Sequence, residues 1–101
     1  MNRPKIVVVG SSNTDMVINT PRLPVRGETI LGGEFMLAAG GKGANQAVAA
    51  ARLGADVTFV GRLGVDMFGD VALKNLRAEG IHTDLIARDD KAPSGVALIL
   101  V

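Results

Sequence analysis

Hydrophobic runs alternate with polar, glycine-punctuated stretches along this chain, and their lengths predict its elements. Ile6–Val9 is a continuous β-branched run ending at a glycine, the pattern of a strand buried on both faces of a parallel sheet. Val57–Val60 has the same character and also ends at a glycine. A shorter stretch, Leu85–Ala87, predicts a third strand. We therefore expect a core sheet of buried strands covered by helices.

Two segments between these runs have hydrophobic residues at helical spacing. Residues 43–53 carry many alanines, which allow close approach to a sheet, and Gly54 is a suitable residue to follow the helix. Residues 67–79 form a second predicted helix, with Asp66 as a candidate N-cap and Gly80 after its end. Strands that alternate with helices indicate an α/β fold.

Other apolar segments with few charges predict a small second sheet, apart from the main one. Thr29–Leu31 and Glu34–Leu37 flank Gly32-Gly33, a pair typical of a tight hairpin turn. Gly95–Val101 is an apolar strand with no polar residue to end it. Because natural domains rarely leave such an apolar edge open, we expect this chain to be part of a longer protein.

Composition narrows the possible functions. The chain has 101 residues, room for one small domain, yet 48% of them are hydrophobic and the mean hydropathy is +0.31. We therefore expect some of its faces to be covered by further chain or by a partner. The net charge of +1 and the lack of a basic block argue against nucleic-acid binding.

The residue types also bear on compartment and metal binding. The sequence has no cysteine, which excludes disulfides and thiolate metal sites and is compatible with a reducing cytosol. No apolar run approaches the roughly 20 residues needed to cross a membrane. We expect a soluble cytoplasmic protein without a membrane partner. His82 is the single histidine and offers little support for a metal site.

The first candidate for chemistry follows the strand predicted at Ile6–Val9. Asn13 and Asp15 are two residues apart, so an extended chain projects both side chains to the same side. A carboxylate accepts from hydroxyls, and an amide both donates and accepts, so the pair could clamp neighbouring hydroxyls. Open α/β sheets also bind ligands at the carboxyl ends of their strands. The alternative, an Asx turn or a solvated loop, stays open.

A glycine-rich stretch, Gly40-Gly41-Lys42-Gly43, opens the first predicted helix. Glycines let the backbone approach a ligand, and the helix N-terminus adds N–H groups and a partial positive charge. Lys42 and Asn45 are three residues apart and can share one face of the first turn. The alternative is an ordinary glycine-rich helix start with an exposed lysine.

Two familiar phosphate-binding motifs do not fit this stretch. A Walker A loop needs Ser or Thr after its lysine and a glycine five residues before it, where this chain has Gly43 and Leu37. A dinucleotide fingerprint starting at Gly41 needs a final glycine where Gln46 stands. A Rossmann dehydrogenase is therefore poorly supported.

Three segments, taken together, resemble the ribokinase branch of the PfkB carbohydrate kinase family. They are GSSNTD at residues 10–15, GGKGANQAVAAARLGA at 40–55 and VGRLGVDMFGD at 60–70. The resemblance implies a Rossmann-like central parallel sheet flanked by helices, with a small β-sheet lid over the sugar. Residues 1–101 would be the N-terminal part of that α/β domain, with lid segments at about 14–38 and 95–101.

The same resemblance implies an activity and the residues that serve it. The activity would be phosphorylation of D-ribose to D-ribose 5-phosphate by MgATP, with K⁺ as a monovalent cation. The sugar-binding residues would be Asn13, Asp15, Gly41, Lys42 and Asn45. The lid would pack against the lid of a second copy, which gives a homodimer.

The family's catalytic motifs are absent from this sequence. There is no Gly-Ala-Gly-Asp motif, whose aspartate is the family's catalytic base, and no Asn-x-x-Glu motif, which the family ties to magnesium. We therefore expect the catalytic, nucleotide and cation sites to lie outside this chain, and the 101-residue stretch alone to be inactive. The alternatives are another sugar or nucleoside kinase of the family, and a noncatalytic sugar-binding or dimerisation module.

Overall fold

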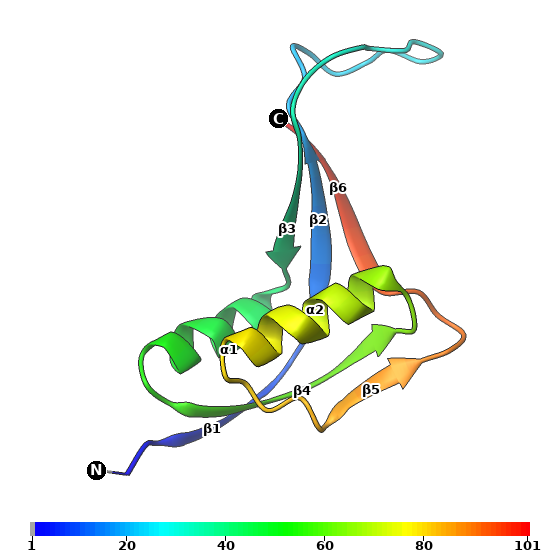
Figure 1. Cartoon of the computed structure of the whole chain (residues 1–101). Helices are drawn as coiled ribbons and strands as arrows, with labels where there is room; N and C mark the ends of the chain where they lie inside the picture. Colours follow the sequence, from blue (N-terminus) through cyan, green and yellow to red (C-terminus); the bar gives the residue numbers. More distant parts are fainter. Residues whose placement is uncertain (1) are drawn as a thin grey trace.

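The computed structural model describes residues 2–101, which form two sheets and two helices (Figure 1). In chain order the elements are β1 (Lys5–Val9), β2 (Asn13–Ile18), β3 (Phe35–Gly40), α1 (Lys42–Arg52), β4 (Asp56–Gly64), α2 (Met67–Ala78), β5 (Ile86–Asp89) and β6 (Gly95–Leu100). One sheet is parallel, in the order β1-β4-β5, and the other is mixed, in the order β3-β2-β6. We call the first sheet with its helices the α/β layer, and the second the upright sheet.

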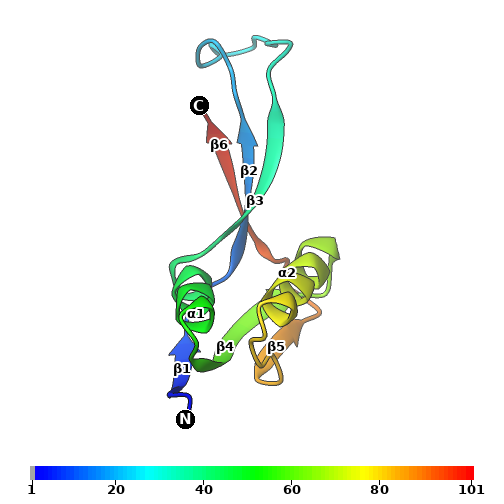
Figure 2. The ribbon, with the colours of Figure 1, turned by 60° about the vertical axis from the view of Figure 1, so that its left-hand side comes forward.

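Both helices lie on the same face of the β1-β4-β5 sheet (Figures 1 and 2). α1 contacts β1 and β4, whereas α2 contacts β4 and the base of β2. Phe59 and Val57 of β4 are fully buried in the core between sheet and helices. Ala47 of α1 is also fully buried, because a small side chain lets the helix approach the sheet closely. The predicted α/β fold is confirmed.

The opposite face of this sheet carries no helix within residues 2–101 (Figure 2). Val8 packs against the core, but its neighbours Val7 and Val9 are 63% and 77% exposed. The prediction that Ile6–Val9 is buried on both faces is therefore wrong for the described chain. The reason is that only one face of the sheet is covered.

The helices follow the sequence closely. α1 and α2 begin and end within one residue of the predicted ranges, and Gly54 and Gly80 adopt the positive φ expected after a helix. Asp66 is confirmed as the N-cap of α2, because its carboxylate accepts a hydrogen bond from Gly69 N at 2.8 Å. Neither helix in residues 2–101 has the length and apolar character needed to cross a membrane.

The upright sheet extends away from the α/β layer (Figures 1 and 2). Its central strand, β2, runs antiparallel to β3 and parallel to β6. The molecule is consequently elongated, with a radius of gyration of 16.2 Å. A compact domain of this length would have about 13 Å. A second, separate sheet is thus present, as expected from the sequence, but its strands are β2, β3 and β6 and do not include Thr29–Leu31.

The predicted hairpin around Gly32-Gly33 is wrong. Residues 29–34 form no strand, and β3 begins only at Phe35 and pairs with β2. The two glycines have φ values of 91° and 94°, and they turn the long loop between β2 and β3 back toward the sheet. A Gly-Gly pair indicates a sharp turn in the local chain. Which strands then pair with each other depends on contacts between segments that are distant in the sequence.

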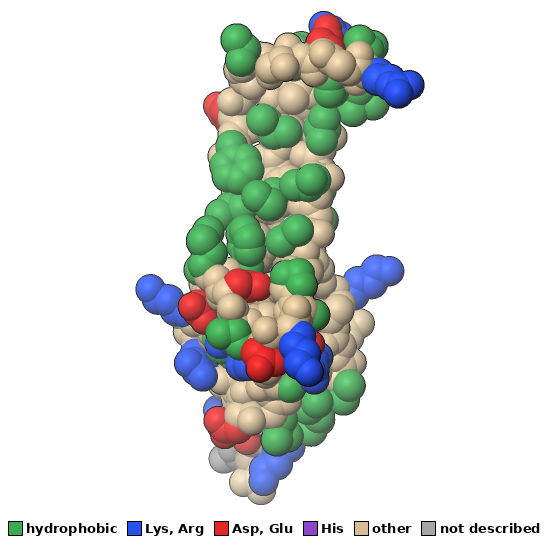
Figure 3. All heavy atoms as spheres, turned by 90° about the vertical axis from the view of Figure 1, so that its right-hand side faces the viewer, with side chains coloured by type: hydrophobic (Ala, Val, Ile, Leu, Met, Phe, Trp, Pro, Cys, Tyr) green, Lys and Arg blue, Asp and Glu red, His purple; other side chains and the backbone are tan. Residues whose placement is uncertain are grey.

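The two faces of the upright sheet differ in character. Alternate residues point to opposite sides, so Asn13 and Asp15 share a face with small residues of the neighbouring strands, which are Ala38, Gly40, Gly95 and Ala97. Larger residues, Val17, Met36 and Ile99, lie on this face only farther from the α/β layer. We call this the Asp15 face. The other, the Leu98 face, has large apolar residues that are 40–75% exposed: Phe35, Leu37, Val96, Leu98 and Leu100. Hydrophobic side chains accordingly dominate the middle of the molecule in Figure 3.

Candidate functional site

Asn13 and Asp15 stand at the base of the upright sheet, where β2 begins. The stretch is extended in β2, which is the condition under which the two side chains were expected to share a side, and both lie on the Asp15 face. Asn13 Nδ2 donates to Asp15 Oδ1 over 2.8 Å, and both residues are half-buried. This bond orients the amide and leaves Asn13 Oδ1 and Asp15 Oδ2 as acceptors for a ligand hydroxyl. We call the pair the Asn13–Asp15 clamp.

Gly40 lies directly against the polar ends of the Asn13–Asp15 clamp. It pairs directly with Asn13 across the sheet, and it is buried. A methyl group at Gly40 would lie 2.7 Å from Asp15 Oδ1 and 2.8 Å from Asn13 Nδ2. The two side chains can take their positions only because this residue has no side chain. Sequence reasoning gave Gly40 no role of its own, since its proximity to the clamp depends on strand register.

The glycine-rich turn between β3 and α1 packs against the connection between β1 and β2. Gly41 has φ 98° and ψ 125°, and a methyl group there would lie 2.6 Å from Ser11 O. Gly43 meets Gly10 backbone to backbone, with its ideal Cβ 2.7 Å from Gly10 Cα. Ala44 N donates to Ser11 O at 3.1 Å. The glycines therefore bring the start of α1 against the chain that leads into the clamp.

Lys42 and Asn45 occupy the first turn of α1 and are both exposed. The N-cap residue, Gly41, has no side chain to cap the helix, so among the N–H groups at the start of α1 that of Ala44 donates to Ser11 O and no side chain caps the rest. The structure therefore places a cationic side chain and an amide beside the glycine-rich turn. Lys42 supplies a positive charge, and the Asn45 amide can donate and accept.

A cleft of about 910 Å³ lies between α1 and α2 beneath the upright sheet. Asn13 and Asn45 border it, whereas Asp15, Gly41 and Lys42 do not. Its remaining lining is mostly apolar, with Leu37 from the upright sheet and side chains such as Val48, Leu53, Met67 and Val71 from the helices. Asn13, Ala38 and Gly40 of the Asp15 face also line this cleft, so its polar end lies beside the Asn13–Asp15 pair and its apolar end lies between the helices.

Metal binding finds no support within residues 2–101, where no three His, Cys, Asp or Glu residues come together as a cluster. The imidazole of His82 has a structural partner, since its Nε2 lies 2.7 Å from Asp56 Oδ1 at the surface.

The α/β layer, the glycine-rich helix start and the polar strand end define a class of protein. The pattern of pfkB family carbohydrate kinases matches residues 3–101, and the chain belongs to this family.

Named relatives lie within this class. The chain is 48% identical over 96 residues to the ribokinase of Bacillus subtilis and 49% identical over 96 residues to that of Mus musculus. These matches cover 95% of this chain but 33% and 30% of the relatives, so the chain spans about a third of their length. A deoxyribokinase of Salmonella typhi is 42% identical over 96 residues, covering 95% of this chain and 31% of that protein.

Solved structures of similar proteins share the fold. The Arabidopsis thaliana ribokinase complexed with ribose and ATP matches with a TM-score of 0.89 and 41% identity, over 99% of this chain and 32% of that one. A Xylella fastidiosa fructokinase with bound ATP matches with a TM-score of 0.80 and 36% identity, over 99% of this chain and 30% of that one. The ribokinase-like fold expected from the sequence is therefore confirmed.

Proposed function

We propose that the protein to which this chain belongs transfers a phosphoryl group from ATP to D-ribose, giving ribose 5-phosphate and ADP. The observation that carries the proposal is the Asn13–Asp15 clamp, held over Gly40 beside the glycine-rich start of α1. Family membership supports a sugar kinase, and the similarity to the ribokinases described above favours ribose as the acceptor.

The clamp would hold neighbouring hydroxyls of the sugar. Asp15 would accept hydrogen bonds from two hydroxyls, and Asn13 would donate one bond and accept another. Because Asn13 Nδ2 already donates to Asp15 at 2.8 Å, the two side chains are oriented before a sugar arrives. Preorganisation of this kind reduces the entropy lost on binding.

The glycine-rich turn would supply the other side of the sugar site. Gly41 would let the backbone come close to the ring, while Lys42 and Asn45 would orient the sugar from the first turn of α1. The positive charge of Lys42 and the helix N-terminus would also favour electron-rich oxygens at this point.

Phosphoryl transfer depends chiefly on positioning and on stabilising charge. We place the catalytic base and the sites for MgATP and K⁺ outside residues 2–101, because the sequence lacks the Gly-Ala-Gly-Asp and Asn-x-x-Glu motifs that the resemblance ties to catalysis and magnesium. On this proposal the 101-residue stretch alone binds no nucleotide and has no kinase activity.

We also propose that the upright sheet is a lid over the sugar and the interface of a homodimer. Its Asp15 face would cover the sugar, and its Leu98 face would pack against the same face of a second copy. The support is the exposure of the large apolar residues on the Leu98 face, a kind of surface that usually has a partner.

The first test is the choice of acceptor. The full-length protein is given ATP, Mg²⁺ and K⁺ with ribose, 2-deoxyribose, fructose, adenosine or no acceptor, and ADP release is measured. We expect the highest kcat/KM with ribose. A higher value with 2-deoxyribose would favour the second candidate, a deoxyribokinase, for which the 42% identical Salmonella typhi relative is the support. No acceptor-dependent rate would contradict both.

The second test addresses the clamp. We expect Asp15→Asn to lower kcat/KM for the acceptor by roughly 10- to 100-fold, since it removes hydrogen bonds to a charged group worth about 1.5–3 kcal/mol. Thr14→Ala is the matched control, because residue 14 is adjacent but faces the opposite side of the sheet. An unchanged acceptor KM and kcat in Asp15→Asn would remove Asp15 from the site.

A further inference from the structure

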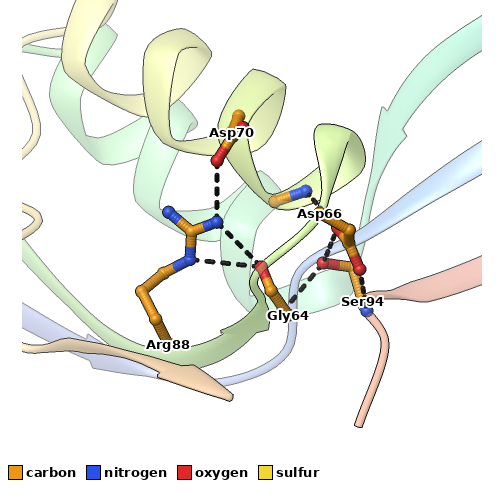
Figure 4. Close-up of polar contacts among 6 residues, drawn as sticks. Gly64, Asp66, Asp70, Arg88 and Ser94 are labelled. Atoms are coloured by element: carbon orange, nitrogen blue, oxygen red, sulfur yellow. Dashed lines mark hydrogen bonds and ion pairs between the residues drawn. The ribbon is translucent and has the colours of Figure 1, made fainter. Parts of the chain in front are cut away.

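Asp66 holds two segments of the chain at once (Figure 4). Its Oδ1 accepts from Gly69 N at 2.8 Å, which caps α2. Its Oδ2 accepts from Ser94 N at 2.8 Å, and Oδ1 also accepts from Ser94 Oγ at 2.8 Å. Capping the helix needs only the first of these bonds. The other two tie α2 to the residue that precedes β6.

Ser94 completes the connection from the other side. It is 7% exposed, and its Oγ accepts from Gly64 N at 2.9 Å while donating to Asp66. The end of β4, the start of α2 and the entry to β6 therefore meet at one hydroxyl (Figure 4). Because each bond joins a different element, the cluster fixes where the upright sheet leaves the α/β layer.

Close packing leaves this cluster little freedom. A methyl group at Gly64 would lie 2.5 Å from both Asp66 Oδ2 and Ser94 N. One at Gly69 would overlap Gly64 O and would lie 3.1 Å from Ser94 Oγ. Arg88 supports the outer side, since its Nη2 donates to Gly64 O at 2.9 Å and to Asp70 Oδ1 at 2.8 Å. Gly64 and Gly69 therefore allow β4, α2 and Ser94 to pack closely around the Asp66 carboxylate.

The cluster lies one residue from the partner of Asn13. Ser94 is followed by Gly95, which pairs with Asn13 at the start of the parallel β2–β6 ladder. The ideal Cβ of Gly95 lies 3.4 Å from Asn13 Cβ. The position of Ser94 therefore sets the place of β6 beside the first residue of the clamp.

We propose that Asp66 and Ser94 form a joint between the α/β layer and the upright sheet, and that they are positioning residues for Asn13. The role of Asn13 as a sugar ligand rests on the proposed function, whereas the existence of the joint does not. The ionised state of Asp66 agrees with this role. Hydrogen bonds from the Ser94 and Gly69 amides and from the Ser94 hydroxyl lower the pKa of Asp66.

One variant separates the joint from the helix cap. Asn is as good an N-cap as Asp, so the D66N side chain can still accept from Gly69 N. With its Oδ1 held by Gly69 N, the NH₂ group that replaces Oδ2 cannot accept from Ser94 N, so the joint loses its charge and a bond. Ser94→Ala removes the hydroxyl from the same joint. Asp84→Asn is the matched control, because it removes the same charge at an exposed carboxylate that lies outside this cluster.

The experiment compares the full-length wild-type protein with these variants by hydrogen exchange and by steady-state kinetics. We expect D66N and S94A to speed amide exchange in β2 and β6 by about tenfold while α2 stays protected. We also expect them to raise the acceptor KM by about tenfold with little change in the ATP KM. The double variant should show the same exchange rates and acceptor KM as each single variant, because each substitution already breaks the same joint.

Each contrary outcome has a distinct meaning. Unchanged exchange in β2 and β6 would overturn the joint, whatever the protein's activity. Faster exchange with an unchanged acceptor KM would overturn the positioning role, as would equal loosening of α2 and equal changes in both KM values. If the wild-type protein phosphorylated no sugar, the proposed function would fall together with the positioning role, while the exchange data would still decide the joint.

Discussion

A residue without a side chain shapes the candidate site most directly. Gly40 sits opposite Asn13, and the polar ends of Asn13 and Asp15 occupy the space that a side chain at position 40 would need. Gly95 flanks Asn13 on its other side with ordinary spacing. The two glycines therefore offer a comparison within one row of the sheet.

We predict that Gly40→Ala raises the acceptor KM by about tenfold, because the new methyl group displaces the clamp. The unfolding free energy should change by no more than about 1 kcal/mol, since the displaced atoms are the ends of side chains. Gly95→Ala, whose Cβ would lie 3.4 Å from Asn13 Cβ, should leave KM unchanged. Equal KM values for both variants, measured by initial rates, would contradict this account of Gly40.

Asp89 gives a prediction about pH. The amides of Ala92 and Lys91 and the guanidinium of Arg62 lower the pKa of Asp89 to about 2. A carboxyl group with a depressed folded-state pKa stabilises the fold above its unfolded value of about 3.9, and this contribution is lost as pH falls toward 2.

The stability difference between wild type and Asp89→Asn should therefore be constant near neutral pH and shrink between about pH 4 and pH 2. Urea unfolding across this range measures it. Asp90→Asn is the control, since Asp90 makes no side-chain hydrogen bond within residues 2–101 of the structure. A difference that grew on acidification would contradict the low pKa of Asp89.

Sequence reasoning at the residue scale succeeded where spacing along the chain was enough. Asn13 and Asp15 were expected to share a side if the chain were extended there, and β2 meets that condition. Asp66 was predicted as an N-cap, but its bonds to Ser94 could not be predicted, because the partner lies far along the chain. Contacts of that kind depend on the folded arrangement of several elements.

At the scale of elements, local patterns predicted helices well and strand partners poorly. Both helices matched within one residue because alanine-rich periodicity and following glycines are local signals. β3 was assigned to a hairpin with residues 29–31, yet its partner is β2. Strand pairing is decided between segments, so the sequence of either strand alone does not specify it.

The core of the α/β layer depends on β4. Phe59 is fully buried, and its ring covers Gly61, where a methyl group would lie 2.6 Å from Cε1. We predict that Phe59→Ala lowers the unfolding free energy by about 3–5 kcal/mol in urea unfolding, because it leaves a cavity. Leu23→Ala, at a side chain that is 71% exposed in the β2–β3 loop, should cost less than about 0.5 kcal/mol. Similar losses in both variants would contradict this view of the core.

At the scale of the whole molecule, the Leu98 face is the most exposed apolar part of the upright sheet. Its namesake, Leu98, is 75% exposed. We predict that Leu98→Asp converts a homodimer into a monomer in analytical ultracentrifugation, since a charge would be buried without a partner. Leu85→Asp, at a side chain that is 61% exposed on the α/β layer, should leave the dimer intact. A monomeric wild-type protein, or a dimeric Leu98→Asp variant, would contradict the proposed interface.

The pairing of β2 with β6 also has a consequence for the order of folding during synthesis. β2 and β3 can pair as soon as both have been made, but β6 is translated after the whole α/β layer, and it must return to β2 in parallel. Loop closure over so long a stretch is slow. We therefore expect most of the α/β layer to emerge from the ribosome and fold before β6 pairs with β2. The clamp would then be among the last parts of this chain to reach its final structure.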